Sequence, residues 1–275
     1  MPKPSTLPDC VRIRPPLYDP SFPYILFWSQ KSGCTTVVKW FFAQLGLLEE
    51  AMAHSSWVHD YEGAVFKKRR FYRRHVAEAL EAGTHKVVKV VRDPMARAPS
   101  AFLVLAERGA VAPRRRHWTQ QHWALVEDWL RTQGKSAEPG LTFLDHLAMV
   151  KEFEARAPQS INQHLSPQYV AGEERYVERV VPIERFAAWT EEVAQEDGVA
   201  PVDMSAIADS RHHHQVTERR TKAFADGAET IPVPRGAFAN GRFPASTIFV
   251  NDRSRPVIRD VYHVDFAAYG ALYGH

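Results

Sequence analysis

The sequence predicts an α/β fold in which a central, mainly parallel sheet is flanked by helices. Residues 24–28 and 86–91 are short apolar runs without a helical period, which is typical of buried central strands. Each run leads through a polar loop into a stretch whose apolar residues have helical spacing. A third apolar run, at residues 179–183, also precedes a helical stretch. Strands that alternate with helices in this way form parallel sheets.

The first strand is expected to follow an extended lead-in, because residues 1–23 are rich in proline. We expect one domain over residues 24–275. Residues 37–45 then repeat apolar side chains on one helical stripe, and Gly46 is suited to the position after the last turn. The beginning of the domain is therefore predicted as strand, loop and helix.

The next unit repeats this order. A basic helix is expected over residues 66–82, followed by the strand at 86–91. Asp93 is a good N-cap and Pro94 suits the first helical position, so a helix is predicted up to about residue 108. Pro99 removes a backbone donor inside that helix and predicts a kink.

The remaining chain contains further helical patterns and one long loop. Helices are predicted at residues 117–132, 141–153, 183–194 and 256–272. The stretch 225–246 is rich in Gly, Pro and Ala and is interpreted as a long mobile loop.

Composition excludes several classes of protein. Of the 275 residues, 45% are apolar and 24% charged, which argues against bulk disorder, and the net charge of +3 is far from that of a dedicated nucleic-acid binder. No apolar run is long enough for a membrane span and no signal-peptide pattern begins the chain, so a cytoplasmic location is expected. Cys10 and Cys34 are the two cysteines, too few for a disulfide framework or a four-cysteine zinc site.

Basic residues form two clusters in the sequence. One lies at residues 67–74 and the other comprises Arg114–Arg116. Each is interpreted as a solvated helix face or, alternatively, as a landing surface for an acidic substrate.

The loop after the first strand has the features of an anion site. Backbone N–H groups at a helix N-terminus attract phosphate, and glycine lets the backbone approach closely. A lysine and two threonine hydroxyls add further donors. The pattern of a nucleotidase P-loop is absent, since the lysine precedes the glycine. The residues predicted to bind phosphate here are Lys31, Ser32, Gly33, Cys34, Thr35 and Thr36.

A second constellation follows the second strand. The segment R-D-P-M-A-R-A-P-S-A-F begins with Arg92, whose guanidinium can fork onto a phosphate, and Ser100 adds a hydroxyl two turns later. Together the K-S-G-C-T-T loop and this segment resemble the sulfotransferases that use 3′-phosphoadenosine-5′-phosphosulfate (PAPS). The resemblance implies a P-loop-like sulfotransferase fold, with the donor at the carboxyl ends of the strands and no metal.

Later segments resemble the carbohydrate branch of that family, which includes the HNK-1 and chondroitin sulfotransferases. These segments are N-Q-H-L-S-P-Q at 162–168, a stretch at 176–185, and V-Y-H-V-D-F-A-A-Y at 261–269. The resemblance implies that Lys31 and residues 32–36 hold the 5′-phosphate side of the donor, and that Arg92 and Ser100 bind the 3′-phosphate. The acceptor is then expected to be a hydroxyl-bearing saccharide.

A base is needed for the acceptor hydroxyl, and histidine suits neutral pH. His59 is the first choice for this base, and Asp60 lies beside it in the sequence. Because the base must be neutral, kcat/KM is expected to fall below a pKa of His59 near 6 to 7. His164 and His54 are the alternatives. The cluster Arg211–His214 is interpreted as a polar loop and not as a metal site, because no acidic or cysteine ligand accompanies it.

Other functions stay open on the sequence alone. One is a non-catalytic module that binds adenosine bisphosphate, and another is a sulfotransferase for a small hydroxylated metabolite or a lipid. A kinase would need metal-binding carboxylates near the loop, and none is evident there. The acceptor and the oligomeric state are not predicted.

Overall fold

The computed structural model describes residues 7–108, 118–208, 215–224, 227–238 and 241–275. Its contacts divide the chain into unit 1, which consists of Met1–Arg92 and Gln168–Arg211, and unit 2, which consists of Asp93–Pro167 and His212–His275. The domain expected over residues 24–275 thus contains two separately packed cores. Arg114–Arg116 and the Arg211–His214 cluster lie outside the described residues.

The predicted parallel sheet is confirmed in unit 1. Its strands are β1 (Tyr24–Phe27), β2 (Lys86–Val91) and β3 (Arg179–Pro182), in the order β1-β2-β3. Both pairs are parallel, with Leu26 opposite Val88 and Val90 opposite Val181. All residues of β1 and five of the six residues of β2 are buried, as expected for strands covered on both faces.

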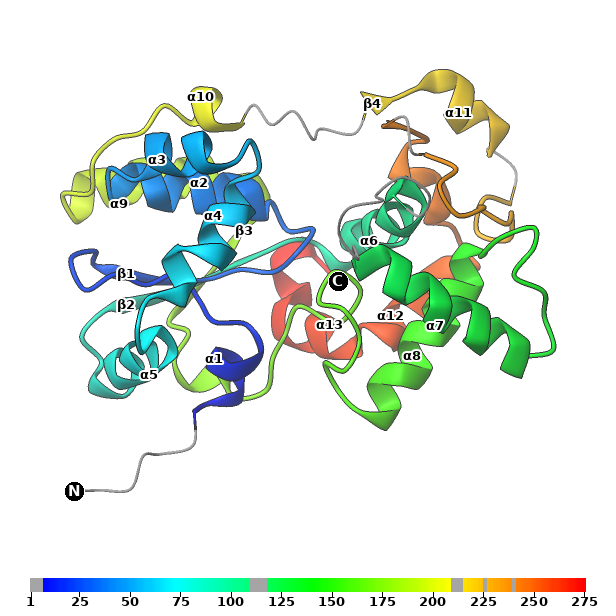
Figure 1. Cartoon of the computed structure of the whole chain (residues 1–275), viewed down its shortest axis with the longest axis horizontal. Helices are drawn as coiled ribbons and strands as arrows, with labels where there is room; N and C mark the ends of the chain where they lie inside the picture. Colours follow the sequence, from blue (N-terminus) through cyan, green and yellow to red (C-terminus); the bar gives the residue numbers. More distant parts are fainter. Residues whose placement is uncertain (1–6, 109–117, 209–214, 225–226, 239–240) are drawn as a thin grey trace. The chain divides into compact units, whose positions relative to one another are not determined.

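Helices lie on both sides of this sheet. In Figure 1, α2 and α9 lie above β1 and β2, whereas α1 and α5 lie below them. The helical elements of unit 1 are α1 (Asp9–Ile13), α2 (Cys34–Gln44), α3 (Leu48–His54), α4 (Val58–Ala64), η1 (Phe66–Lys68), α5 (Tyr72–Ala82), η2 (Glu173–Arg175), η3 (Ile183–Arg185), α9 (Phe186–Glu196) and α10 (Met204–Ala208).

Aromatic packing anchors α2, the helix that follows the predicted anion loop. The Trp40 ring lies 5.4 Å from that of Trp189 and 5.7 Å from that of Phe186, both on α9. Phe41 lies 5.5 Å from Phe66 on η1. Because these rings are fully or almost fully buried, the start of α2 is held in a fixed position by its own core.

Unit 2 is mainly helical. The predicted cap at its start is confirmed, since Asp93 Oδ1 accepts the Met95 N–H at 2.9 Å, and Pro99 lies inside the helix that follows. The elements of unit 2 are α6 (Pro94–Arg108), α7 (Trp118–Thr132), α8 (Phe143–Arg156), β4 (Gln215–Val216), α11 (Glu218–Ala223), β5 (Arg242–Phe243), η4 (Ser246–Phe249), α12 (Ser254–Val261), α13 (His263–Tyr269) and η5 (Gly270–Tyr273).

Two predicted helices are interrupted. The helix expected at 66–82 breaks at Phe71, which has φ 62°, and Tyr72 next to it donates its hydroxyl to Pro16 O at 2.8 Å. The helix expected at 256–272 breaks at Tyr262, whose hydroxyl donates to Leu165 O at 2.9 Å. In both places a hydrogen bond from a tyrosine to a distant carbonyl accompanies the break in the regular pattern.

Two segments predicted to lack regular structure contain some. The proline-rich lead-in forms α1, and Leu17 bridges Leu26 of β1. In the stretch expected to be a mobile loop, the described residues include β5 and the buried side chains of Val233 and Phe238. Apolar residues within these segments reach a core, which overrides their content of proline and glycine.

A buried histidine on α8 predicts how stability depends on pH. The His146 ring is fully buried against Phe102 and Phe143, and among the described residues no group hydrogen-bonds to either ring nitrogen. Burial, with a smaller contribution from His122, lowers the pKa of His146 to about 3. The unfolded chain, with a histidine pKa near 6.5, takes up a proton that the folded protein excludes.

The free energy of unfolding should therefore fall as the pH drops below about 6.5. Between pH 7 and pH 5 we expect His146 to account for a loss of about 2 kcal/mol. His146→Phe should remove this part of the pH dependence in urea denaturation, whereas His263→Gln, at an exposed position, should leave it. Equal pH profiles for the wild type and His146→Phe would contradict the prediction.

Candidate functional site

The predicted anion loop connects β1 to α2 in a strained, closely packed conformation. Gly33, before the first residue of α2, has φ 71°, and its carbonyl accepts the N–H groups of Thr36 and Val37 at 3.0 and 3.2 Å. A Cβ at this glycine would lie 2.3 Å from the Ile183 side chain. Lys31 also has a positive φ, 67°, which is uncommon for a residue with a side chain. Such strain is found at ligand-binding loops.

The geometry of this loop suits an anion. The first N–H groups of a helix lack partners within the helix and carry the positive end of its dipole. Cys34 and Thr35 occupy these positions in α2 and are partly exposed, whereas the N–H of Thr36 donates to the Gly33 carbonyl. The ammonium group of Lys31 adds a full positive charge to the same loop.

Arg92, from the second motif, is brought to the same loop. Since β1 and β2 are parallel neighbours, their carboxyl ends share one edge of the sheet. Arg92 follows β2 directly, and its Nη1 donates to the carbonyl of Lys31 at 3.2 Å. The structure thus joins the two segments that the sequence analysis singled out.

Gln168 joins both segments through its side chain. Its Oε1 accepts the Ser32 hydroxyl at 2.5 Å and the Arg92 N–H at 3.0 Å, and its Nε2 donates to the Arg92 carbonyl at 2.8 Å. The N–H of Ser32 donates to Ser29 O at 3.2 Å. Ser32 is fully buried, so its hydroxyl orients the loop. Gln168 ends the N-Q-H-L-S-P-Q segment, but no role was predicted for its side chain from the sequence.

A buried ion pair holds the backbone carbonyl of Gln168 in place. Lys89 of β2 donates to Glu173 Oε2 at 2.6 Å and to the Gln168 carbonyl at 3.0 Å. The side chains of Lys89 and Glu173 are only 1% and 3% exposed. Arg14 donates to the same carbonyl at 2.9 Å. The side chains of Lys89 and Arg14 therefore fix the backbone at Gln168.

His59, the first choice for the base, lies at the anion loop. It is on α4, and its Nε2 lies 3.4 Å from Thr35 Oγ1. Its Nδ1 lies 2.6 Å from Glu62 Oε2. Asp60, which lies beside His59 in the sequence, accepts from the Ser55 hydroxyl at 2.8 Å. The partner is Glu62 because residues three apart share one face of a helix.

Two further side chains, those of Cys34 and Lys67, interact with the His59–Glu62 pair. These four residues are called the His59 cluster. Cys34, the first residue of α2, is the neighbour that does most to raise the pKa of His59. Lys67 lies 2.6 Å from Glu62 Oε1. Glu62 is 4% exposed, and its two carboxylate oxygens pair with His59 and Lys67. Glu62 was not predicted as a member of the site, because no helix was predicted around His59. Lys67 was predicted only as part of the basic cluster at residues 67–74.

The charged groups of this cluster shift one another's pKa values. Burial alone would lower the pKa of His59, but Cys34 and Glu62 raise it to about 10. Burial would raise the pKa of the Cys34 thiol, but His59 and then Lys31 lower it below its ordinary value. Burial would raise the pKa of Glu62, but Lys67 and His59 lower it to about 2. Cys34 and Glu62 thus raise the pKa of His59 above the range of 6 to 7 that was expected for it.

The other predicted site residues lie elsewhere in the chain. Ser100 is on α6 and His164 follows Asn162, both in unit 2. His164 Nδ1 lies 2.7 Å from Asn162 Oδ1, and Arg97 Nη2 donates to the His164 carbonyl at 3.4 Å. His54 is exposed at the end of α3. The roles of these residues stay predictions.

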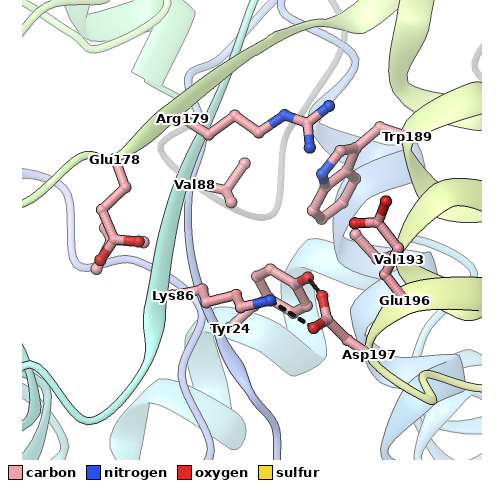
Figure 2. Close-up of a pocket in the computed structure, with 10 residues that line it drawn as sticks. Tyr24, Lys86, Val88, Glu178, Arg179, Trp189, Val193, Glu196 and Asp197 are labelled. Carbon is pink, nitrogen blue, oxygen red and sulfur yellow. Dashed lines mark hydrogen bonds and ion pairs between the residues drawn. The ribbon is translucent and has the colours of Figure 1, made fainter.

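A surface pocket of about 230 Å³ lies at the opposite edge of the sheet (Figure 2). Its walls include Tyr24 and Lys86, the first residues of β1 and β2. Both donate to Asp197, as the dashed lines show. These polar groups satisfy one another, so we place the candidate site at the anion loop.

Comparisons of the chain with protein-family models, with curated proteins and with solved structures find no match. Within the described part of the chain, no helix combines the length and apolar character needed to cross a membrane. The described residues also contain no group of three or more His, Cys, Asp or Glu side chains placed to hold a metal ion.

Proposed function

We propose that the protein is a sulfotransferase with a P-loop-like fold, which moves a sulfuryl group from PAPS to a hydroxyl of an acceptor. The observation that supports this most is that Lys31, the start of α2, Arg92 and His59 gather at one edge of the sheet. A donor with a 5′-phosphosulfate and a 3′-phosphate needs an anion loop and a second cation. An acceptor hydroxyl needs a base within reach of the same place.

Each residue has a chemical part in this proposal. The N–H groups at the start of α2 and the hydroxyls of Thr35 and Thr36 hold the 5′-phosphate. Lys31 stabilises the charge that develops on the leaving oxygen. Arg92 holds the 3′-phosphate, and Ser100 is proposed for the same group from the sequence resemblance.

The reaction needs little covalent chemistry from the protein. The acceptor oxygen forms a bond to sulfur while the bond from sulfur to the bridging oxygen breaks, and adenosine 3′,5′-bisphosphate leaves. His59 takes the proton of the acceptor hydroxyl. As in phosphoryl transfer, catalysis then rests on positioning and charge stabilisation.

The acceptor is proposed to be a saccharide, because the later segments of the sequence resemble carbohydrate sulfotransferases. A small hydroxylated metabolite or a lipid is the alternative. Incubating the protein with PAPS labelled in its sulfate, together with fractions of a cell extract, will identify the acceptor fraction. Donor binding without label in any fraction would favour a non-catalytic nucleotide-binding module.

The donor assignment is tested by comparing two nucleotides in calorimetry. Adenosine 3′,5′-bisphosphate should bind about 10- to 150-fold more tightly than adenosine 5′-monophosphate, which corresponds to one charge-assisted contact of about 1.5 to 3 kcal/mol. Arg92→Ala should remove this difference while the monophosphate affinity changes little.

Arg73 on α5 provides the control, since it is exposed. Arg73→Ala removes the same charge and should keep the preference for the bisphosphate. Equal affinities of the wild type for the two nucleotides would refute the donor assignment. Equal losses for both nucleotides in Arg92→Ala would mean that Arg92 acts only through its hydrogen bond to the loop.

A further inference from the structure

Basic side chains lie close together on the surface of unit 1, in η1, at the start of α5 and in the turn between them. Six of the eight residues 67–74 are Lys or Arg and none is Asp or Glu, so this segment carries twice the net charge of +3 of the whole chain. Lys67 is only 14% exposed and pairs with Glu62. The other five basic side chains are exposed and are called the basic patch: Lys68, Arg69, Arg70, Arg73 and Arg74.

Most of the charge of the basic patch is not neutralised by the protein itself. Two of its arginines have a carboxylate partner, since Arg69 pairs with Asp19 at 3.0 Å and Arg74 lies 3.4 Å from Glu78. Exposed ion pairs of this kind are weak. The other three side chains have no carboxylate partner among the described residues: Lys68, Arg70 and Arg73. The basic patch therefore presents its positive charge to whatever contacts it.

An exposed aromatic ring lies among these cations. Phe71 is 47% exposed, whereas every other Phe, Tyr and Trp side chain that the structure describes is buried or half-buried. The guanidinium groups of Arg70 and Arg74 lie over the Phe71 ring, 4.6 and 4.1 Å from its centroid. The basic patch thus combines positive charge with apolar surface at one place.

The backbone of Phe71 is strained and firmly held. Its φ of 62° lies in the left-handed region, where a bulky side chain is an outlier and Asn or Gly fits better. The residues around it are anchored, because the rings of Phe66 and Tyr72 lie 5.7 Å apart and both are buried. An exposed phenylalanine in this conformation gains neither burial nor a relaxed backbone. Strain of this kind is typical of functional positions.

The surface of an anionic lipid bilayer complements both properties of the basic patch. Clusters of about four to eight Lys and Arg residues bind anionic headgroups, and this attraction acts within a Debye length. A phenyl ring enters the boundary between headgroups and acyl chains, while Arg and Lys keep their charged ends at the headgroups. Single-stranded nucleic acid is matched less well, because its binding proteins stack successive bases on several aromatic side chains. The basic patch contains one exposed ring.

We propose that the basic patch and Phe71 form a docking surface for an anionic phospholipid membrane. The phenyl ring enters the interface, and the unpaired cations contact the lipid phosphates. The helix α5 stays in the fold, since its apolar residues Val76 and Leu80 are buried in the core of unit 1. Docking of this kind requires neither the anion loop nor His59, so it is independent of the proposed function.

Membrane docking is tested by sedimenting the full-length protein with lipid vesicles. Vesicles of phosphatidylcholine with about 30% phosphatidylserine should bind the protein, and vesicles of phosphatidylcholine alone should not. Raising NaCl from about 0.1 to 1 M should weaken the binding strongly, because the Debye length falls from about 10 to 3 Å. No binding to the anionic vesicles, or equal binding to both kinds, would overturn the proposal.

Charge variants show whether the basic patch is the surface that binds. The double variant Arg70→Gln with Arg73→Gln should bind the anionic vesicles about 25-fold more weakly, since each basic residue near such a surface contributes about fivefold. The matched control is Arg175→Gln with Arg185→Gln, because both are exposed arginines of unit 1 outside the patch. This control should bind nearly as well as the wild type. Equal losses in the two double variants would contradict docking through the basic patch.

Replacing Phe71 separates docking from folding. Phe71→Asn removes the ring and suits the left-handed backbone, so its melting temperature should be no lower than that of the wild type. Its affinity for the anionic vesicles should fall about tenfold, because the buried apolar area of the ring is lost. A lower melting temperature with unchanged vesicle binding would mean that Phe71 serves the fold alone, and the proposal would fail.

A soluble polyanion provides the last comparison. Single-stranded oligothymidylate carries dense negative charge without a lipid phase, and it should bind more weakly than the anionic vesicles. Weaker binding of this kind supports a membrane as the partner. Tighter binding of the oligonucleotide, lost in the variant Arg70→Gln with Arg73→Gln, would show that the basic patch serves a nucleic acid and that the membrane proposal is wrong.

Discussion

Replacing Glu173 by alanine should lower the free energy of unfolding by about 3 to 5 kcal/mol, because it leaves the charge of Lys89 buried without its carboxylate. Lys89 lies on β2, the central strand of the sheet, and its side chain is 1% exposed. Lys89 Nζ lies 2.6 Å from Glu173 Oε2, and the same ammonium group donates to the Gln168 carbonyl. Urea denaturation should show a lower midpoint with an unchanged slope.

Two comparisons isolate this effect. Glu178→Ala, at an exposed position five residues further on, should change stability by no more than about 0.5 kcal/mol. The double variant Lys89→Met with Glu173→Leu should regain much of the loss, since apolar side chains often replace a buried ion pair without harm. If Glu173→Ala were as stable as Glu178→Ala, the pair would not support the fold.

The secondary structure that could be predicted from the sequence is local. The strands at β1 and β2 are short runs of apolar residues, and the cap at Asp93 depends on the residues beside it. The breaks at Phe71 and Tyr262 could not be predicted in this way. Each accompanies a tyrosine hydroxyl that bonds a carbonyl far away in the chain.

The candidate site could also be predicted from the sequence only in part. The meeting of Lys31 and Arg92 follows from parallel strands, because both residues come after carboxyl ends of neighbours. Gln168 joins Ser32 across 136 positions of the sequence, and no local pattern indicates such a contact. Glu62 was within reach of prediction, since helical spacing from His59 leads to it once a helix is assumed there.

At a pH near 10, where neutral His59 is populated, His59→Ala should lower kcat/KM by about 10²- to 10⁴-fold, the usual contribution of a general base, while the affinity for adenosine 3′,5′-bisphosphate stays nearly unchanged. His59 lies beside the anion loop, and Glu62 fixes its ring. The rate is measured with labelled PAPS and the acceptor fraction that takes up label. A loss of nucleotide binding equal to the loss of rate would contradict a role as base.

The same substitution at the other candidates provides the controls. His54→Ala alters an exposed side chain on α3 and should leave the rate unchanged. His164→Ala tests the segment at residues 162–168. If His164→Ala abolishes turnover while His59→Ala keeps most of it, the base lies in that segment and the role of His59 is wrong. The proposed sulfuryl transfer would survive that result.

The pH dependence of kcat/KM provides the sharpest test of His59. A base must be neutral, and Cys34 and Glu62 raise the pKa of His59 to about 10. The rate should therefore rise with pH, about tenfold per unit, from pH 7 towards 10. Cys34→Ser removes the thiolate, lowers the pKa of His59 and should move this rise to lower pH. A rise centred between pH 6 and 7 in the wild type, unmoved by Cys34→Ser, would show that the thiol and the imidazole titrate independently.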